Sequence, residues 1–247
     1  LDMQLRDLSK GEHAIVQFGK AAVRTGVTTA TDLYADLEDS DVETLLAVTA
    51  RDDYPLRIVP AFGVIGLEPQ VAVTRALALK ARSTDRLRMG ICKVMTDGSI
   101  QGFTARVKWP GYIHGQPNGI WNLEPTRLKA LITALHAGGI NMQVHTNGDE
   151  ASDFVLDCFE EAMCQHPTGD SRHTLQHCQM AGEDQFYRAA RLGVCVNLFA
   201  NHLWFYGDAH VEFTVGPDRA ARLNACRSAL GDGVTLAIHS DSPVTQL

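Results

Sequence analysis

The feature that most constrains this chain is a regular alternation of apolar, β-branched runs with segments of helical period. Seven short, nearly continuous apolar runs are separated by segments in which apolar residues recur at every third or fourth position. Strands that are apolar on both faces are typical of parallel sheets covered by helices on both sides. The alternation therefore predicts a parallel α/β fold, with residues 1–247 forming one domain.

The boundaries of the expected elements follow from this periodicity and from the glycines and prolines between segments. Strands are expected at residues 27–33, 56–64, 87–95, 140–145, 173–178, 193–199 and 235–241. Helices are expected at residues 8–24, 41–52, 70–82, 124–137, 150–164, 183–191 and 217–230. Two longer stretches, 99–123 and 200–216, are expected to be loops, and loops of that length usually carry function.

The number of strands separates two architectures. A (β/α)₈ barrel requires eight strands, whereas an open, doubly wound sheet could stop at seven. An open sheet of that kind usually has a glycine-rich phosphate turn after its first strand, and the sequence contains no G-x-G-x-x-G motif.

Composition limits the kind of partner. With 247 residues, of which 45% are hydrophobic, the chain is long enough to bury a substantial core. The net charge of -7 and the lack of a Lys and Arg run argue against nucleic acid, and no apolar stretch is long enough to cross a membrane. Six cysteines without C-x-x-C spacing indicate reduced thiols, which favours a soluble, cytoplasmic protein.

Four polar residues stand at or near the carboxyl ends of expected strands: Lys93, His145, His177 and Asp241. In a parallel barrel these ends meet on one face, so residues about 150 positions apart can share a pocket. Neutral imidazoles bind Zn²⁺, a carboxylate binds metal or accepts a proton, and a desolvated lysine can react with CO₂ to give a bridging carbamate. The sequence therefore predicts that these four side chains converge.

Seven blocks of sequence carry a family resemblance. In order they are GVTTATD, KVMTDGS, VHTNGD, LQHCQ, NHLWFYGDAH, GPDRAAR and HSDSPV. The blocks cover nearly the whole chain, and together they resemble the family 3 amidohydrolases, especially the YtcJ-like group. The resemblance implies a (β/α)₈ TIM barrel that holds one or two divalent metal ions, with Zn²⁺ as the favoured ion, to activate water.

The resemblance also implies a role for each strand-end residue. Lys93 would be the carboxylated lysine of barrel strand four, which bridges two metals. His145 and His177 would be the metal ligands of strands five and six. Asp241 would be the catalytic aspartate of strand eight, which binds metal and takes a proton from the attacking water.

The sequence departs from the family in one respect. The family's first barrel strand ends in a His-x-His pair, and no such pair occurs here. The first expected strand, 27–33, corresponds to barrel strand two, so we expect strand one and the family's flanking β-sandwich to lie outside these residues. A barrel lacking strand one should self-associate, hold about one metal weakly and turn over little substrate.

Simpler interpretations exist for these residues. A strand-end histidine can be a hydrogen-bonding core residue, and Lys93 could pair with a carboxylate such as Asp97. Asp241 precedes turn-forming residues and could cap a helix or form a turn. His239 lies two residues earlier on the same expected strand, where packing beneath Asp241 is the expected role.

Aromatic and histidine residues outside the strands complete the prediction. His202, Trp109 and Trp204 are expected to contact substrate. Aromatic residues of the two expected loops either pack the loops or, as aromatic-rich loops above a barrel mouth often do, wall a substrate pocket: Trp109, Tyr112, Trp121, Trp204 and Tyr206. Three histidines on or beside helices are assigned to the surface: His13, His136 and His166.

These predictions define one principal function and two alternatives. The principal one is metal-dependent hydrolysis of a C–N bond, in an amide or cyclic amide of a small molecule, with one or two metals. The first alternative is a mononuclear deaminase in which the lysine is not a ligand. The second is a catalytically inactive barrel that lacks half of the metal site.

Overall fold

The computed structural model describes residues 11–242 and 244–245. The expected start of the first helix, at residue 8, lies outside these residues. The chain divides into two compact units. Among the described residues, the first contains residues 11–64 together with Thr74–Lys93, and the second contains Ile65–Val73 and the residues from Val94 to residue 245. Within the described residues, no helix is both long and apolar enough to span a bilayer.

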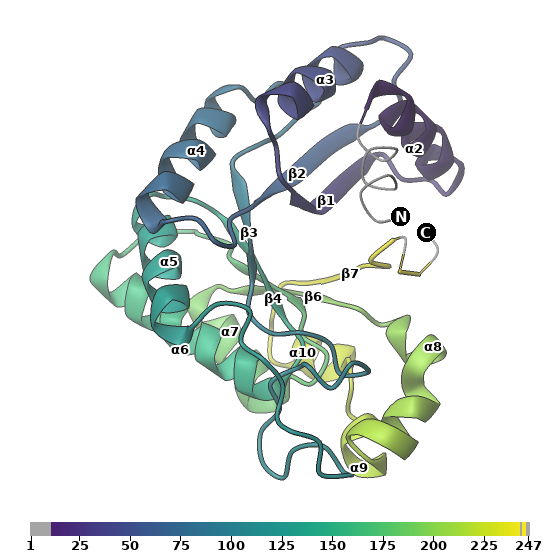
Figure 1. Ribbon diagram of the computed structural model, residues 1–247, viewed down its shortest axis with the longest axis vertical. Helices are drawn as coiled ribbons and strands as arrows, with labels where there is room; N and C mark the ends of the chain where they lie inside the picture. Colours follow the sequence, from purple (N-terminus) through teal and green to yellow (C-terminus); the bar gives the residue numbers. More distant parts are fainter. Residues whose placement is uncertain (1–10, 243, 246–247) are drawn as a thin grey trace. The chain divides into compact units, whose positions relative to one another are not determined.

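The first unit is built on three parallel strands (Figure 1). Strand β1 pairs with β2, and β2 pairs with β3, where Gly63 lies opposite Lys93. Gly26, with φ of 83°, follows the first helix at the position where the sequence predicts its end. The elements found wholly or largely in this unit are α2 (Glu12–Arg24), β1 (Thr29–Ala35), α3 (Asp39–Thr49), β2 (Arg57–Gly63), α4 (Pro69–Ala81) and β3 (Ile91–Met95).

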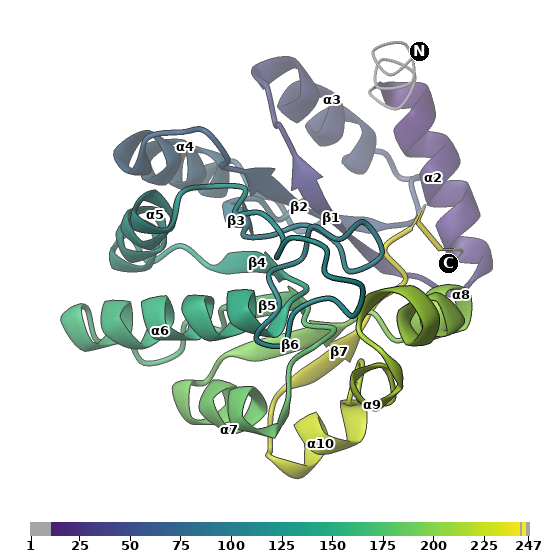
Figure 2. The ribbon, with the colours of Figure 1, turned by 60° about the horizontal axis from the view of Figure 1, so that its bottom comes forward.

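The second unit contains four parallel strands in the order β4-β5-β6-β7. Helices α5, α6 and α7 lie side by side, and α7 contacts α10 (Figure 2). Its elements are α5 (Pro125–Ala137), β4 (Met142–Thr146), α6 (Asp149–Gln165), β5 (Thr174–His177), α7 (Glu183–Leu192), β6 (Cys195–Leu198), α8 (His202–Ala209), η1 (His210–Thr214), α9 (Pro217–Ala220), α10 (Cys226–Gly231) and β7 (Leu236–Ile238).

The predicted alternation of strands and helices is confirmed, and the strand limits differ at several places. Strand β3 begins at Ile91 rather than at residue 87, because Gly90 has φ of 92° and interrupts the extended backbone. Leu87 instead forms an isolated bridge with Ile58. Strand β7 is also shorter than expected, covering Leu236–Ile238 instead of 235–241.

The prediction of a loop at 200–216 is wrong, because most of this stretch is helical. Helix α8 is followed directly by the π-helix η1. His202, Tyr206 and His210 recur at intervals of four, so their rings lie on one helical face, where the His202 ring stacks on those of Tyr206 and His210. His210 Nδ1 also lies 3.0 Å from Thr214 Oγ1, one further turn along. Contacts between polar side chains on this face thus stabilise a helix that the apolar spacing of the segment does not predict.

The single helix predicted at 217–230 is also wrong. The structure contains two short helices, α9 and α10, separated at Asn224, whose φ of 52° is left-handed. The Asn224 backbone N–H donates to the carbonyl of Gln179 at 2.8 Å, so it is used outside the helix. A contact with a distant residue therefore divides the segment.

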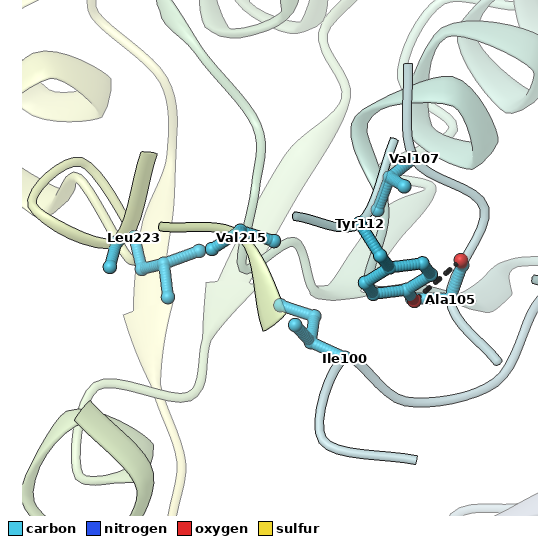
Figure 3. Packing of buried hydrophobic residues seen from close by; sticks show 7 residues of the cluster. Ile100, Ala105, Val107, Tyr112, Val215 and Leu223 are labelled. Carbon is cyan, nitrogen blue, oxygen red and sulfur yellow. Dashed lines mark hydrogen bonds between the residues drawn. The ribbon is translucent and has the colours of Figure 1, made fainter. Parts of the chain in front are cut away.

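The stretch 99–123 is irregular, as predicted, and an apolar cluster in the second unit fixes it. Figure 3 shows Ile100, Val107 and Tyr112 of this stretch packed with Val215 and Leu223. The Tyr112 hydroxyl donates to the Ala105 carbonyl at 2.9 Å, and the side chain is only 4% exposed. Of the two roles expected for Tyr112, the structure supports loop packing, because the buried ring holds the loop in place.

The assignment of His136 to the surface is wrong. His136 is buried on α5, with Nδ1 2.9 Å from His173 Nε2 and Nε2 2.8 Å from the His166 carbonyl. The His173 ring stacks on Phe159 at 4.8 Å. Burial, with the nearby His136, lowers the pKa of His173 to about 3, so the imidazole is neutral. His13 and His166 are exposed, as predicted.

Candidate metal centre

Two predicted ligands lie on neighbouring strands of the second unit. His145 is in β4, His177 is the last residue of β5, and both are buried. In the parallel register His145 is opposite Gln176, one residue before His177. Their ring centroids are 4.6 Å apart, with the ring planes at 68°. The structure thus brings these two predicted ligands together.

Asp241 lies close to His177, and an unpredicted residue joins them. The His239 backbone N–H donates to the Leu198 carbonyl at 3.1 Å, which continues the pairing of β7 with β6. The His239 ring is 4.9 Å from the His177 ring. Ligand atoms of His177, His239 and Asp241 all lie within 4.8 Å of one another.

The expectation that His239 packs beneath Asp241 is therefore corrected. The expected strand of residues 235–241 would have kept both side chains on one face at different depths. Strand β7 ends at Ile238 instead, and Asp241 has a left-handed φ of 52°. Because the backbone turns here, Asp241 and His239 belong to the same group of possible metal ligands. The apolar spacing predicts a strand as far as residue 241, so it does not indicate that β7 ends at Ile238.

The backbone of the centre is unusual at three residues. His177, Cys178 and Asp241 have φ of 70°, 51° and 52°, in the left-handed region that non-glycine residues rarely adopt. Such residues each cost about 1–3 kcal/mol and cluster at functional sites. The Cys178 N–H donates to the Thr146 carbonyl at 2.8 Å, which helps to hold the bend after β5.

A buried carboxylate organises the residues after β4. Asp97 is fully buried and accepts backbone N–H groups from Arg106, Asn147 and Gly148 at 2.9, 3.0 and 2.9 Å. Its Oδ1 lies 3.7 Å from His145 Nε2. Burial raises the pKa of Asp97 to about 7 although these hydrogen bonds oppose the shift. Asp97 thus ties the loop at Arg106 to the segment that follows His145.

Lys93 belongs to the first unit, whereas the two histidines and Asp241 belong to the second. Its side chain is 3% exposed, and it lies opposite Gly63 of β2. The convergence of Lys93 with the histidines, and its carboxylation, stay predictions.

The predicted substrate-contact residues differ in burial. His202 is 2% exposed, while Trp109 and Trp204 are 94% and 86% exposed. The Phe199 ring stacks on His239 at 4.9 Å and lies 5.1 Å from the His202 ring, so it connects His202 to the metal-ligand group. Substrate contact by any of the three stays a prediction.

His202 is the first member of a series of hydrogen-bonded side chains. His202 Nδ1 lies 3.3 Å from His210 Nε2, and His210 Nδ1 lies 3.0 Å from Thr214 Oγ1. Burial lowers the pKa of His202 and of His210 to about 4 each, with His210 also contributing to the shift of His202. Both imidazoles are therefore neutral at pH 7.

The donor set fits a divalent metal. Two imidazoles and one carboxylate are ligands that Zn²⁺ accepts, and three protein ligands leave a fourth position for water, as in catalytic zinc sites. In the part of the chain that the structure describes, His177, His239 and Asp241 are the single group of three or more histidine, cysteine or acidic residues gathered in this way.

Comparison with known proteins agrees with this chemistry. The sequence profile of the amidohydrolase family matches residues 2–247. Bacillus subtilis (strain 168) YtcJ, which is named as an amidohydrolase, is 29% identical over 174 residues, covering 70% of this chain and 32% of YtcJ. Arabidopsis thaliana LONG AFTER FAR-RED 3 is 26% identical over 185 residues, covering 72% of this chain and 31% of that protein.

The fold agrees as well. A metal-dependent hydrolase from Pyrococcus furiosus superposes with a TM-score of 0.75 at 20% identity, covering 94% of this chain and 46% of that one. In sequence, the chain spans about a third of the length of the two relatives, YtcJ and LONG AFTER FAR-RED 3. Since the family profile matches almost all of its residues, the chain belongs to the amidohydrolase family.

Proposed function

We propose that this chain forms the metal-binding part of a hydrolase that cleaves a C–N bond in a small amide or cyclic amide. The observation that carries the proposal is the grouping of His177, His239 and Asp241 at the carboxyl ends of parallel strands. The proposal includes a (β/α)₈ TIM barrel whose strand one and flanking β-sandwich lie outside these residues. Family membership supports a metal-dependent hydrolase.

In this proposal His177 and His239 hold a divalent metal, with Zn²⁺ favoured, and Asp241 is the third ligand. A bound metal would activate water and polarise the substrate carbonyl. Asp241 is partly exposed, so its carboxylate can accept a proton from water and deliver it to the leaving nitrogen. Lys93 and His145 are proposed as the remaining ligands of a fuller centre.

Neighbouring groups keep these residues in place. The Asp97 carboxylate, through the backbone of Asn147 and Gly148, fixes the turn after β4. Phe199 packs against His239 and holds its ring orientation. Hydrolysis requires that the reacting groups stay aligned, and these contacts keep the side chains in fixed positions.

A mononuclear deaminase is the second candidate. One group of three ligands suffices for one ion, and this grouping includes no contribution from Lys93. The two reactions differ in the product: a deaminase releases ammonia, whereas amide hydrolysis forms a carboxylate and an amine, which stay in one molecule when the amide is cyclic. A non-catalytic barrel is the third candidate, and it would bind metal without turnover.

Metal content tests the site. We expect about one ion per purified chain by elemental analysis, and at least a tenfold weaker affinity in both His177→Ala and His239→Ala. His13→Ala, at an exposed position on α2, is the matched control and should retain the ion. Two tightly held metals, or one ion that both substitutions leave in place, would show that the ligands are assigned wrongly.

Activity tests the reaction. The chain, loaded with Zn²⁺, should be assayed against a panel of N-acyl amines, cyclic amides and aminated heterocycles, with amine and ammonia quantified separately. We expect slow amide hydrolysis that Asp241→Asn abolishes. Ammonia release from the heterocycles alone would favour the deaminase, and metal binding without any turnover would favour the non-catalytic barrel.

A further inference from the structure

The second unit contains a cavity of about 560 Å³, a size that suits a small molecule. Its walls come from the first residues of α6 and α7 and from the segment that spans α9 and α10. Helices α6 and α7 follow the carboxyl ends of β4 and β5, where His145 and His177 lie. The cavity is therefore at the same end of these strands as the candidate metal centre.

Two of the charged residues lining the cavity already have partners. The Asp149 carboxylate accepts the backbone N–H of Lys108 at 2.8 Å, and the Lys108 ammonium forms an ion pair with Asp153. Burial raises the pKa of Asp149 despite these contacts. The charges of Lys108 and Asp149 are thus already paired within the cavity wall.

The positive side of the cavity has unused hydrogen-bonding capacity. Arg219 donates Nε to the Val215 carbonyl at 3.0 Å and Nη2 to the Gly111 carbonyl. Its Nη1 is buried and finds no acceptor among the described residues. Desolvation lowers the pKa of Arg219. Arg222, which is exposed, also lines the cavity.

The acidic side comes from the start of α7. Glu183 and Asp184 are its first two residues, are exposed, and form no ion pair within the described part of the chain. Acidic residues at a helix start are common because they complement the helix dipole, so by themselves they indicate no ligand. Here they line the same cavity as Arg219 and Arg222 and do not pair with them.

We propose that this cavity binds a small zwitterion, with its carboxylate on Arg219 and Arg222 and its ammonium on Glu183 and Asp184. The buried Nη1 of Arg219 has no acceptor among the described residues, and a small rotation of the guanidinium would let a carboxylate in the cavity accept from it. A ligand with a single charge can be matched by only one of these two walls, whereas a zwitterion can be matched by both. A free amino acid or a dipeptide has both charges and a suitable size.

Three related probes separate these cases. Glycylglycine has both charges, N-acetylglycine has only the carboxylate, and glycinamide has only the ammonium. Binding to the 247-residue chain is measured by isothermal titration or by ligand-observed NMR, after removal of metal with a chelator. We expect glycylglycine to bind at least fivefold more tightly than either blocked probe.

Variants locate the site. Arg222→Gln and Glu183→Gln should each weaken glycylglycine binding about tenfold, because each removes one charge-assisted contact. Arg227→Gln and Asp218→Asn change exposed charges on α10 and α9 that do not line the cavity, and they should leave binding unchanged. Thermal melting of each variant confirms that the fold is retained.

Several results would overturn the proposal: equal binding of the three probes, binding that the Glu183 and Arg222 variants leave unchanged, or equal losses in the two control variants. Because the readout is binding to metal-free protein, its failure is distinct from the failure of the proposed hydrolytic function.

Discussion

At the scale of single residues, Gly148 shows how closely the turn beside His145 is packed. A Cβ at this position would lie 1.7 Å from the Arg106 carbonyl oxygen, and the obstacle is backbone that cannot rotate away. The φ of Gly148 is -79°, which any residue adopts, so space alone requires glycine here. The same peptide N–H is bound by Asp97.

Gly148→Ala should therefore lower the free energy of unfolding by at least about 3 kcal/mol, because the added methyl must displace the Arg106 backbone. Urea denaturation followed by circular dichroism measures the change. Gly169→Ala is the matched control, since no atom lies within 4 Å of a Cβ there. Equal effects of the two substitutions would contradict the tight packing.

His173 makes stability depend on pH. Its pKa is about 3 in the folded chain and about 6.5 when unfolded, so the unfolded state binds the proton more readily between these values. The stabilisation is complete above pH 6.5 and is lost as the pH falls from 6.5 towards 3. His173 alone should reduce the unfolding free energy by roughly 2 kcal/mol between pH 7 and pH 5.

Unfolding curves at several pH values check this expectation. His173→Gln should show a shallower decline of stability on acidification than the unmodified chain, because one buried neutral imidazole has been removed. His13→Gln, at an exposed position, should retain the original decline. An identical pH dependence in all three proteins would show that His173 is protonated without penalty.

At the scale of elements, α8 and η1 are held together by polar contacts. The His202–His210 and His210–Thr214 contacts run along one buried face, and the Tyr206 ring stacks on His202 at 4.5 Å. Buried polar groups stabilise an element only when each has a partner, so the loss of one contact should loosen the whole segment.

Thr214→Val removes the hydroxyl next to His210 and keeps the side-chain shape. We expect a loss of about 1–2 kcal/mol in unfolding free energy, because the buried His210 Nδ1 loses its partner. Amide hydrogen exchange in residues 202–214 should become faster. Thr44→Val, which removes a hydroxyl that donates to the Ser40 carbonyl within α3, is the control and should leave exchange in residues 202–214 unchanged. Unchanged exchange after Thr214→Val would exclude a role for this contact.

At the scale of the whole molecule, β1 and β7 are the two outermost strands in the strand order. Within the described residues β1 pairs only with β2, and β7 pairs only with β6. Unpaired strand edges are templates for association with another chain. Ile238, at the end of β7, is 61% exposed and adds an apolar contact to that edge.

The chain should therefore self-associate, and Ile238→Lys should shift it towards monomer, because a charge on a strand edge opposes pairing. Size-exclusion chromatography with light scattering measures the mass. Leu230→Lys, on α10 with a similar exposure of 62%, is the matched control and should leave the mass distribution unchanged. A monodisperse monomer that melts cooperatively would contradict the prediction.

The sequence by itself determined the order of strands and helices and the residues at the strand ends. Local period is enough for this, because the apolar spacing of a segment decides whether it can cover a parallel sheet or form one of its strands. The same pattern predicts that His145, His177 and Asp241 converge, whereas their roles as metal ligands came from the family resemblance. The structure places them near one another in the second unit.

Three other features depend on the tertiary structure, and the local spacing of apolar residues does not predict them. His239 joined the ligand group because β7 ends early, and the segment 200–216 became helical because its polar residues found partners on one buried face. Asn224 divided a predicted helix by bonding to Gln179, forty-five residues earlier in the chain. These outcomes depend on contacts between residues distant in sequence, and burial and hydrogen bonding there outweigh local propensity.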